Sequence, residues 1–362
     1  MSHKYVFLKE VCEKASSNIA QKDLAECDGI YPIYGASGYI KSVDFFQQAK
    51  DYIAIVKDGA GIGRAMKLPA KSSVIGTMQY ILPNDNINIS YLYYAICSMH
   101  LEKYFSGATI PHIYFRDYQN EQLPLPTLEE QAKIANVFGR IDYFIKKEKE
   151  QLINLDELVK SRFIEMFGDP VINSKGWITK RLPELGTLSR GMSKHRPRNA
   201  PELLGGPYPL IQTGDVANAD GYIKEYTSTY SELGFRQSKM WPKGTLCITI
   251  AANIAKTAIL EFASCFPDSI VGFNAYSAVT NEYIHHWFTF VQRIIEEQAP
   301  ESAQKNINMK ILSDLKVMVP DKNIQHEYVD FLKQVDKSKL AIQQSLDELE
   351  TLKKSLMQQY FG

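Results

Sequence analysis

The chain has 362 residues, 45% of them hydrophobic and 23% charged, which is the composition of an ordinary globular protein with room for two domains. The 41 Lys and Arg residues are balanced by 41 Asp and Glu, so a globally basic nucleic-acid-binding protein is excluded and any such surface must be local. The five cysteines form no CxxC pair, and neither a signal core nor a membrane-length apolar run is present, so we expect a reduced, cytoplasmic chain.

Residues 1–126 are predicted to form a first globular domain that is rich in Gly and Tyr. Its apolar runs, which we expect to be strands, are 52–56, 80–82 and 110–115. Between the first two, Gly59-Ala60-Gly61-Ile62-Gly63 resembles a phosphate-binding loop, but its spacing matches neither GxGxxG nor GxxxxGK(S/T). We therefore expect a tight turn between two strands at this position.

Residues 127–167 are predicted to form one long helix. Apolar side chains recur there at mostly three- or four-residue spacing, and Glu148 falls where this stripe thins. The stripe consists of Ile134, Val137, Ile141, Phe144, Leu152, Leu155, Leu158 and Phe163. Thr127 and Glu130 form a capping box directly after Pro126, and Gly168 is expected to end the helix.

Residues 168–319 are predicted to form a second globular domain in the style of the first, with strands expected at 246–250, 259–262, 279 and 317–319. Tyr208-Pro209-Leu210 matches Tyr31-Pro32-Ile33, and Asn253-Ile254-Ala255-Lys256 takes the place of Gly61-Ile62-Gly63-Arg64. The loops between these matches differ in length. A shared scaffold with divergent loops is what two related readers of different ligands would need.

Residues 320–362 repeat the first long helix at a fixed offset, because Pro320 lies 194 residues after Pro126. The pairs shared at this offset include Gln131/Gln325, Asp142/Asp336, Leu152/Leu346, Leu155/Leu349, Leu158/Leu352, Phe167/Phe361 and Gly168/Gly362. Helices of this length, about 60 Å, need each other to bury their stripes. We therefore expect a mixed α/β fold in which two globular domains are joined by an antiparallel coiled coil with pseudo-two-fold symmetry, although the periodicity alone also fits a parallel pair.

No catalytic constellation accompanies these domains. The chain has no GxSxG, HExxH or Asp-Pro-Pro-Tyr-type methyltransferase motif. Pro267-Asp268 with Asp314-Leu315-Lys316 fits only a loose nuclease pattern across a long gap. His285-His286 lies in an amphipathic segment, where a surface or core pair is favoured over a metal site. The chain is therefore expected to be non-catalytic, with no metal or cofactor of its own.

Candidate nucleic-acid contacts occur at matched places in both domains. The stretch 187–201 holds four of them and no acidic residue, which suits phosphate binding as well as an ordinary solvated loop. Amide and hydroxyl groups at strand ends suit base edges, although turns use the same residues. The candidates are Tyr34, Ser37, Arg64, Thr109, His112, Arg116, Arg190, Lys194, Arg196, Arg198, Gln212, Thr213, Lys256, Lys305 and Asn306.

Taken together, these features resemble the specificity (S) subunit of type I restriction-modification systems over essentially the whole chain. The helical part of the resemblance is carried by Leu123-Pro124-Leu125-Pro126 with Glu130-Gln131, by Ser161-Arg162-Phe163 and Phe167-Gly168, and by the second copy over 349–361. Residues 31–35, 59–64 and 208–211 are similar to strands and turns of that family's target-recognition domains. The second copy departs from the pattern, because Asn323-Ile324-Gln325 replaces the usual Glu-Gln pair.

The resemblance implies that 1–126 and 168–319 are target-recognition domains, each reading one half of a bipartite double-stranded DNA target. The helices would space the halves and dock two DNA methyltransferase (M) subunits, with restriction/translocase (R) subunits as further partners. S-adenosylmethionine, ATP and magnesium would belong to those partners. Apolar residues off the main helical seam are the expected docking surface, namely Phe138, Ile145, Val159, Ile164 and Met357. The alternatives are a specificity chain of a methyltransferase-only or fused system, or a DNA-modifying enzyme in its own right.

Overall fold

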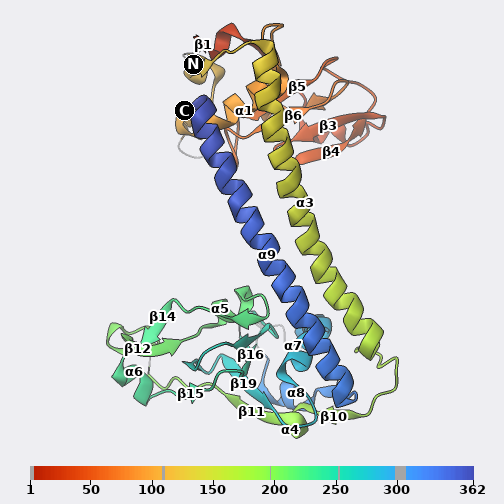
Figure 1. Ribbon diagram of the computed structural model, residues 1–362, viewed down its shortest axis with the longest axis vertical. Helices are drawn as coiled ribbons and strands as arrows, with labels where there is room; N and C mark the ends of the chain where they lie inside the picture. The colour runs from red at the N-terminus through yellow and green to blue at the C-terminus, as the bar shows by residue number, and fades with distance from the viewer. Residues whose placement is uncertain (1–3, 108–110, 196, 252, 298–306) are drawn as a thin grey trace. The chain divides into compact units, whose positions relative to one another are not determined.

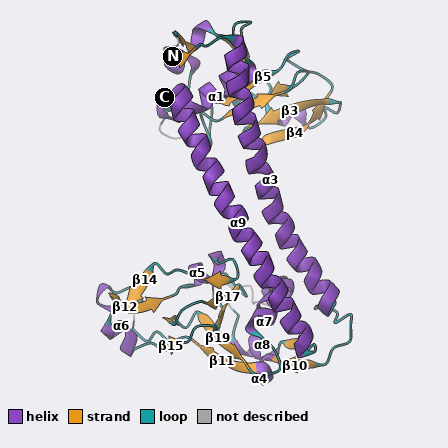
Figure 2. Ribbon diagram, in the orientation of Figure 1, coloured by secondary structure: helices purple, strands orange, loops and turns teal. Residues whose placement is uncertain are grey.

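The computed structural model describes residues 4–107, 111–195, 197–251, 253–297 and 307–362 (Figure 1). The chain divides into unit 1, residues 1–151 with 341–362, and unit 2, residues 152–340. Two helices of 40 residues each, α3 (Leu128–Phe167) and α9 (Lys322–Phe361), contribute to both units and run without a break (Figure 2). Both units combine helices with sheets, so the predicted mixed α/β class is confirmed. Within the described residues, no helix combines the length and apolar character needed to cross a membrane.

Unit 1 packs helix α1 against an antiparallel sheet of order β2-β8-β5-β6. The strands of this unit are β1 (Tyr5–Phe7), β2 (Cys12–Ser16), β3 (Tyr31–Gly35), β4 (Gly38–Val43), β5 (Tyr52–Val56), β6 (Ala65–Leu68), β7 (Ser73–Val74), β8 (Met78–Pro83) and β9 (Gln122–Pro124). Its short helices are α1 (Ile89–Ser98) and α2 (Phe115–Tyr118), with 3-10 turns at Leu8–Glu10, Gln21–Leu24 and Leu101–Tyr104. Asn88 starts α1 by accepting hydrogen bonds from the amides of Ser90 and Tyr91.

Unit 2 packs helix α7 against a sheet of order β11-β19-β16-β17-β13. Its strands are β10 (Thr179–Arg181), β11 (Gly186–Arg190), β12 (Leu204–Leu210), β13 (Tyr222–Ile223), β14 (Ser228–Tyr230), β15 (Met240–Trp241), β16 (Leu246–Thr249), β17 (Thr257–Leu260), β18 (Ser264–Cys265), β19 (Ile270–Ala275) and β20 (Lys316–Met318). Its helices are α4 (Leu182–Leu185), α5 (Thr213–Asn218), α6 (Glu232–Arg236), α7 (Asn281–Glu297) and α8 (Met309–Asp314), with a 3-10 turn at Pro201–Leu203.

The two units repeat one fold. The order β2-β8-β5-β6 of unit 1 corresponds to β11-β19-β16-β17 of unit 2. In each unit the strand that carries the Tyr-Pro pair runs parallel to a short strand, β3 beside β7 and β12 beside β18. Each unit also has an antiparallel pair whose later strand leads towards a long helix, β1 with β9 and β10 with β20. The internal repeat predicted from the sequence is thereby confirmed.

One buried glutamine fixes the start of each long helix. Gln131 accepts a hydrogen bond from the amide of Asn88 at 2.7 Å and donates to the carbonyl of Pro126 at 2.9 Å. Gln325 accepts from the amide of Thr280 at 3.1 Å and donates to the carbonyl of Pro320 at 2.9 Å. Both amide groups are almost fully buried and satisfied, so each long helix is tied to the residues that begin α1 or α7.

Within each unit the paired segments of α3 and α9 run in opposite directions. In unit 1, Asp142 pairs with Lys353 at 2.6 Å and Lys149 with Glu350 at 3.1 Å. In unit 2, Asp156 pairs with Lys339 at 2.5 Å and Arg162 with Glu327 at 2.9 Å. Higher numbers on α3 thus meet lower numbers on α9. The half-buried Glu148, at the thin point of the predicted stripe, accepts a hydrogen bond from Ser345 at 2.7 Å.

The helix-end signals in the sequence are confirmed. The amide of Thr127 donates to the Glu130 carboxylate at 3.1 Å and the Thr127 hydroxyl accepts from the Glu130 amide at 3.3 Å, which is the predicted capping box. Gly168 ends α3 with φ +82° and bonds back to the carbonyl of Ile164. Both signals act between residues at most four positions apart, so they do not depend on tertiary packing.

Two of the predicted strands are wrong. Of the stretch 110–115, residue 110 lies outside the described residues, the part around His112 forms isolated bridges to Asp58 and Ser106, and Phe115 begins α2. Pro111 lacks the N–H group that a strand ladder requires. Val279 lies in a bend before α7, where its side chain is 3% exposed and packs in the core. The strand expected at 259–262 begins earlier and ends at Leu260.

The predicted helical seam is only partly correct. Phe138 was placed off the seam, but it is fully buried, with its ring centroid 4.8 Å from that of Tyr94 and 5.9 Å from that of Phe361. Val137, Phe144 and Leu158, which are expected in the seam of α3, are 40%, 47% and 47% exposed, and Leu352 in the stripe of α9 is 47% exposed. In unit 1 the buried face of α3 differs because α3 packs against α1 as well as against α9.

Candidate nucleic-acid interface

In unit 1, the turn between β5 and β6 places Arg64 against the β3–β4 hairpin, which holds Tyr34 and Ser37. Gly59, Gly61 and Gly63 all have φ between +81° and +85°, which makes this stretch the predicted tight turn rather than a phosphate loop. A Cβ at Gly63 would lie 2.6 Å from the backbone nitrogen of Glu102, so this position also lacks space for a side chain. The guanidinium of Arg64 donates to the carbonyl of Ala36, in the β3–β4 hairpin that holds Tyr34 and Ser37.

The other side of the same turn holds His112 and, beyond it, Arg116. The amide of Gly59 donates to the carbonyl of Pro111 at 2.9 Å, and His112 Nδ1 lies 2.7 Å from Asp58 Oδ1. Arg116 is exposed and lies over the ring of Tyr114. A groove beside these residues is lined by Lys14, Ser16, Lys57, Gln79, Ile113, Tyr114, Phe115, Arg116 and Gln119. Cations, amides and an exposed aromatic ring side by side suit a nucleic acid.

In unit 2, the basic stretch, residues 187–201, is held against the rest of the unit by hydrogen bonds and an ion pair. Arg190 donates to the carbonyl of Asp268 at 3.1 Å, and Arg198 forms an ion pair with the Asp268 carboxylate. The amide of Lys194 donates to Gln237 Oε1 at 2.6 Å, while the side chain of Lys194 is exposed. Asp268, which belonged to the loose nuclease pattern, therefore positions two arginines.

The structure brings Arg198 next to Gln212 and Thr213. These three residues line one pocket with Asn199 and Ser269, although Arg198 and Gln212 lie on different segments. Gln212 begins α5, where its amide donates to the Asp215 carboxylate at 2.7 Å and its side chain stays exposed. A cation beside an exposed amide can contact a phosphate and a neighbouring base edge together.

Lys256 takes the position in unit 2 that Arg64 has in unit 1. The amide of Thr249 donates to the carbonyl of Lys256 at 2.9 Å, as the amide of Val56 donates to the carbonyl of Arg64 at 3.0 Å. Ala255 has φ +56°, so it adopts the left-handed conformation of Gly63 despite its side chain. The two turns are structural counterparts. The candidates Thr109, Arg196, Lys305 and Asn306 lie outside the described residues.

The expected docking residues differ in accessibility. Ile164 is 38% exposed, while Val159 and Met357 are half-buried. Val159 packs against the core of unit 2, and its carbonyl accepts a hydrogen bond from Tyr328 at 3.4 Å. The large apolar residues that the long helices expose are Leu128, Val137, Tyr143, Phe144 and Leu352 in unit 1, and Ile153, Leu158, Ile164 and Leu340 in unit 2.

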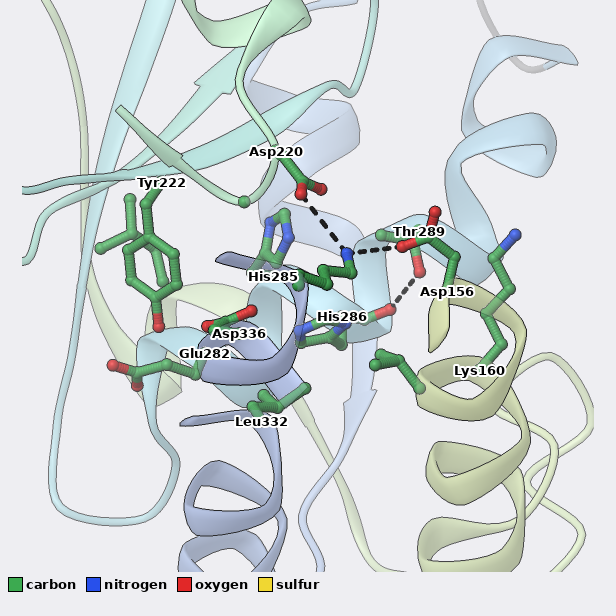
Figure 3. Close-up of a pocket in the computed structure, with 14 residues that line it drawn as sticks. Asp156, Lys160, Asp220, Tyr222, Glu282, His285, His286, Thr289, Leu332 and Asp336 are labelled. Atoms are coloured by element: carbon green, nitrogen blue, oxygen red, sulfur yellow. Dashed lines mark hydrogen bonds and ion pairs between the residues drawn. The ribbon is translucent and has the colours of Figure 1, made fainter. Parts of the chain in front are cut away.

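A second pocket of unit 2 lies between α3, α7, α9 and the turn before β13 (Figure 3). Lys339 lies 2.5 Å from Asp156 and 3.3 Å from Asp220 there, and His285 Nδ1 lies 2.8 Å from the hydroxyl of Thr257. Burial lowers the pKa of His285 to about 4, although Asp220 opposes this shift. Burial, His285 and Lys339 together lower the pKa of His286 well below its usual range. Both rings are therefore neutral at pH 7, and α7 is amphipathic as predicted.

Acidification from pH 7 to pH 5 is expected to destabilise unit 2. The folded histidines bind fewer protons than the unfolded ones, so stability is lost as pH falls through the unfolded pKa near 6.5 and continues to fall towards 4. For His285 the loss at pH 5 is about 2 kcal/mol. Asp336, whose pKa is raised by burial, acts in the opposite direction. The free energy of unfolding in urea is therefore measured against pH for the parent and for His285→Asn. His326→Asn, at an exposed histidine, is the control. Identical pH profiles of the parent and His285→Asn would contradict the prediction.

Each unit has its own candidate site of cations, amides and hydroxyls. The described residues include no cluster of His, Cys, Asp and Glu that could hold a metal ion. Tyr114, Lys14 and Lys57 were not among the sequence candidates. The aromatic and basic residues at 114–116, which begin two residues after His112, are the signal that identifies Tyr114.

The chain is similar to type I restriction enzyme specificity subunits. The MjaIX type I restriction enzyme specificity subunit of Methanocaldococcus jannaschii is 26% identical over 179 residues, which is 44% of this chain and 40% of that protein. The EcoBI specificity subunit of Escherichia coli is 22% identical over 298 residues, or 71% of this chain and 61% of that protein. The chain thus spans less than two thirds of the length of these relatives.

Solved structures share the fold. The type I restriction-modification S subunit from M. genitalium aligns over 100% of this chain and 96% of its own with a TM-score of 0.65 at 15% identity. A chain from work on complex assembly and conformational transition of the type I R-M system aligns over 99% of this chain and 97% of its own, with a TM-score of 0.60 at 16% identity. Residues 3–156 and 174–351 each match the type I restriction modification DNA specificity domain. With two copies of that domain over most of its length, the chain belongs to the type I restriction modification DNA specificity family.

Proposed function

We propose that this chain is the sequence-specific DNA-binding subunit of a type I restriction-modification complex, in which each unit reads one half of a bipartite target. The observation that carries this proposal is the repeated fold with matched turns, because Arg64 and Lys256 occupy equivalent positions beside different loops. Equivalent scaffolds bind two DNA segments in a similar manner, while different loops read different bases.

The two long helices act as the spacer and as the docking surface for two methyltransferase subunits. The opposed ion pairs within each unit support an antiparallel coiled coil along both helices, and the internal repeat supports a pseudo-two-fold relation between the recognition domains. A rod of about 60 Å would separate half-sites by a set number of unread base pairs, since one turn of B-DNA is roughly 34 Å. The exposed apolar residues of α3 and α9 provide the surface for the partner subunits.

The subunit itself is non-catalytic. Its candidate residues are of the types that contact phosphates and base edges, and the sequence has no methyltransferase motif beside them. S-adenosylmethionine is assigned to the methyltransferase subunits, and ATP and magnesium are assigned to restriction subunits where these are present.

Methylation-aware sequencing of the source genome, with and without this gene, tests the proposal. Deletion is expected to remove methylation from one split motif and from no other. An unchanged methylation pattern would contradict the proposed function. S-adenosylmethionine-dependent methyl transfer by the purified chain alone would contradict its non-catalytic role.

A further inference from the structure

Tyr114 is 46% exposed although two neighbours fix its ring. The guanidinium carbon of Arg116 lies 4.8 Å from the ring centroid, and the imidazole of His112 lies at 23° to the ring with centroids 6.4 Å apart. A cation–π contact of this kind favours one orientation of an exposed ring. The ring is therefore ordered in advance, which reduces the entropy lost when it binds a ligand.

The segment that carries Tyr114 is tied to the β5–β6 turn at several points. Asp58 Oδ1 lies 2.7 Å from His112 Nδ1, and Asp58 Oδ2 lies 2.5 Å from Lys57 Nζ. The amide of Ile113 donates to the carbonyl of Lys57 at 2.9 Å. Asp58 thus fixes the ring that lies beside Tyr114, and the backbone on either side of His112 has one position relative to the turn.

The groove next to Tyr114 carries the chemistry that DNA requires. Lys14 bonds to the hydroxyl of Ser16, and the side chain of Arg116 is 77% exposed with its Nε 3.5 Å from the Asp117 carboxylate. Gln119 lines the same groove. Two accessible cations suit the phosphates of one DNA segment, and the phenol of Tyr114 in the same groove can reach the base edges of that segment.

We propose that Tyr114 is a specificity-determining residue of unit 1, whose hydroxyl-bearing ring edge contacts base edges of the first half-site while Lys14 and Arg116 contact the flanking phosphates. This inference rests on the proposed function. Because these contacts favour one orientation of the ring, the hydroxyl can discriminate between a hydrogen-bond partner and a group that cannot pair with it.

The first test compares Tyr114→Phe with the parent, both assembled with the methyltransferase, on duplexes that carry the motif found by methylation sequencing. Each base pair of the first half-site is substituted in turn. Tyr114→Phe is expected to reduce discrimination at one or two of these positions by about 5- to 150-fold. Discrimination at the second half-site and affinity for fully scrambled DNA should not change. Tyr5→Phe removes the hydroxyl of another exposed tyrosine of unit 1, 53% exposed on β1, and should behave like the parent.

The second test places p-benzoylphenylalanine at position 114 and, as control, at position 5. Photocrosslinks from position 114 are expected on the first half-site only. If the parent discriminates at the first half-site but Tyr114→Phe keeps every preference, the inference is overturned. Crosslinks from position 114 to the second half-site, or equal losses at both half-sites with a lower Tm, would also overturn it. A parent complex that prefers neither half-site would instead contradict the proposed function.

Discussion

Alanine at Lys194, Arg196 and Arg198 is expected to weaken DNA binding by roughly 100-fold at low salt and to reduce the slope of log K against log salt by about 2–3. Each phosphate contact contributes about 0.9 to that slope because it releases condensed counterions. Arg198 supports the prediction most directly, because it lines one pocket with Gln212 and Thr213. The effect should be confined to the second half-site, since these residues belong to unit 2.

The measurement is a salt series on duplexes in which either half-site is scrambled. Lys180 and Arg181 on β10 offer a matched control, since their replacement removes a lysine and an exposed arginine of the same unit away from the pocket. Gln212→Ala should keep the parental slope and instead lower discrimination at the second half-site, as a base contact would. If the triple variant keeps the parental salt slope, the basic stretch does not contact phosphates.

Aspartate at Leu158 or Ile164 is expected to reduce methyltransferase co-purification by at least 100-fold while the chain still folds. These side chains are 47% and 38% exposed, so the isolated chain tolerates a charge there. In an assembled interface the same charge would be buried without a partner, at a cost of about 3–5 kcal/mol. Val159→Asp differs, because Val159 packs against the core of unit 2 and its replacement should also lower the free energy of unfolding.

The control is aspartate at Gln151, an exposed polar position of α3. It should leave both co-purification and Tm unchanged. Thermal denaturation of each variant separates loss of assembly from loss of folding. Normal recovery of the methyltransferase with Leu158→Asp and Ile164→Asp together would show that neither position is part of the docking surface.

Helix ends could be predicted from the sequence, whereas the buried face of a helix could not. The capping box at Thr127 and the glycine at position 168 act over a few residues, and both appear where expected. Phe138 and Phe144 lie on the same helix with similar side chains, but only Phe138 meets Tyr94 of α1. A periodic stripe shows that one face of a helix is buried. It does not show that a further helix, here α1, buries residues outside that stripe.

The sequence predicts candidate residues that are close together in the chain. It does not predict which distant residues the fold brings beside them. The acid-free stretch that contains Lys194 and Arg198 could be identified by composition alone. The proximity of Arg64 to Ala36, and of Arg198 to Gln212, depends on strand pairing and loop packing. A strand over 110–115 does not predict an exposed Tyr114, because its ring is exposed by an irregular backbone with isolated bridges at His112.

The paired turns at Gly63 and Ala255 give the two units unequal freedom to evolve. In unit 1 no residue with a side chain can replace Gly63 without displacing the backbone at Glu102, so mutations at this position should be eliminated by selection. In unit 2 the same left-handed conformation already carries the methyl group of Ala255, buried within the core. The turn of unit 2 therefore accepts glycine or alanine at this position, whereas the turn of unit 1 accepts glycine alone.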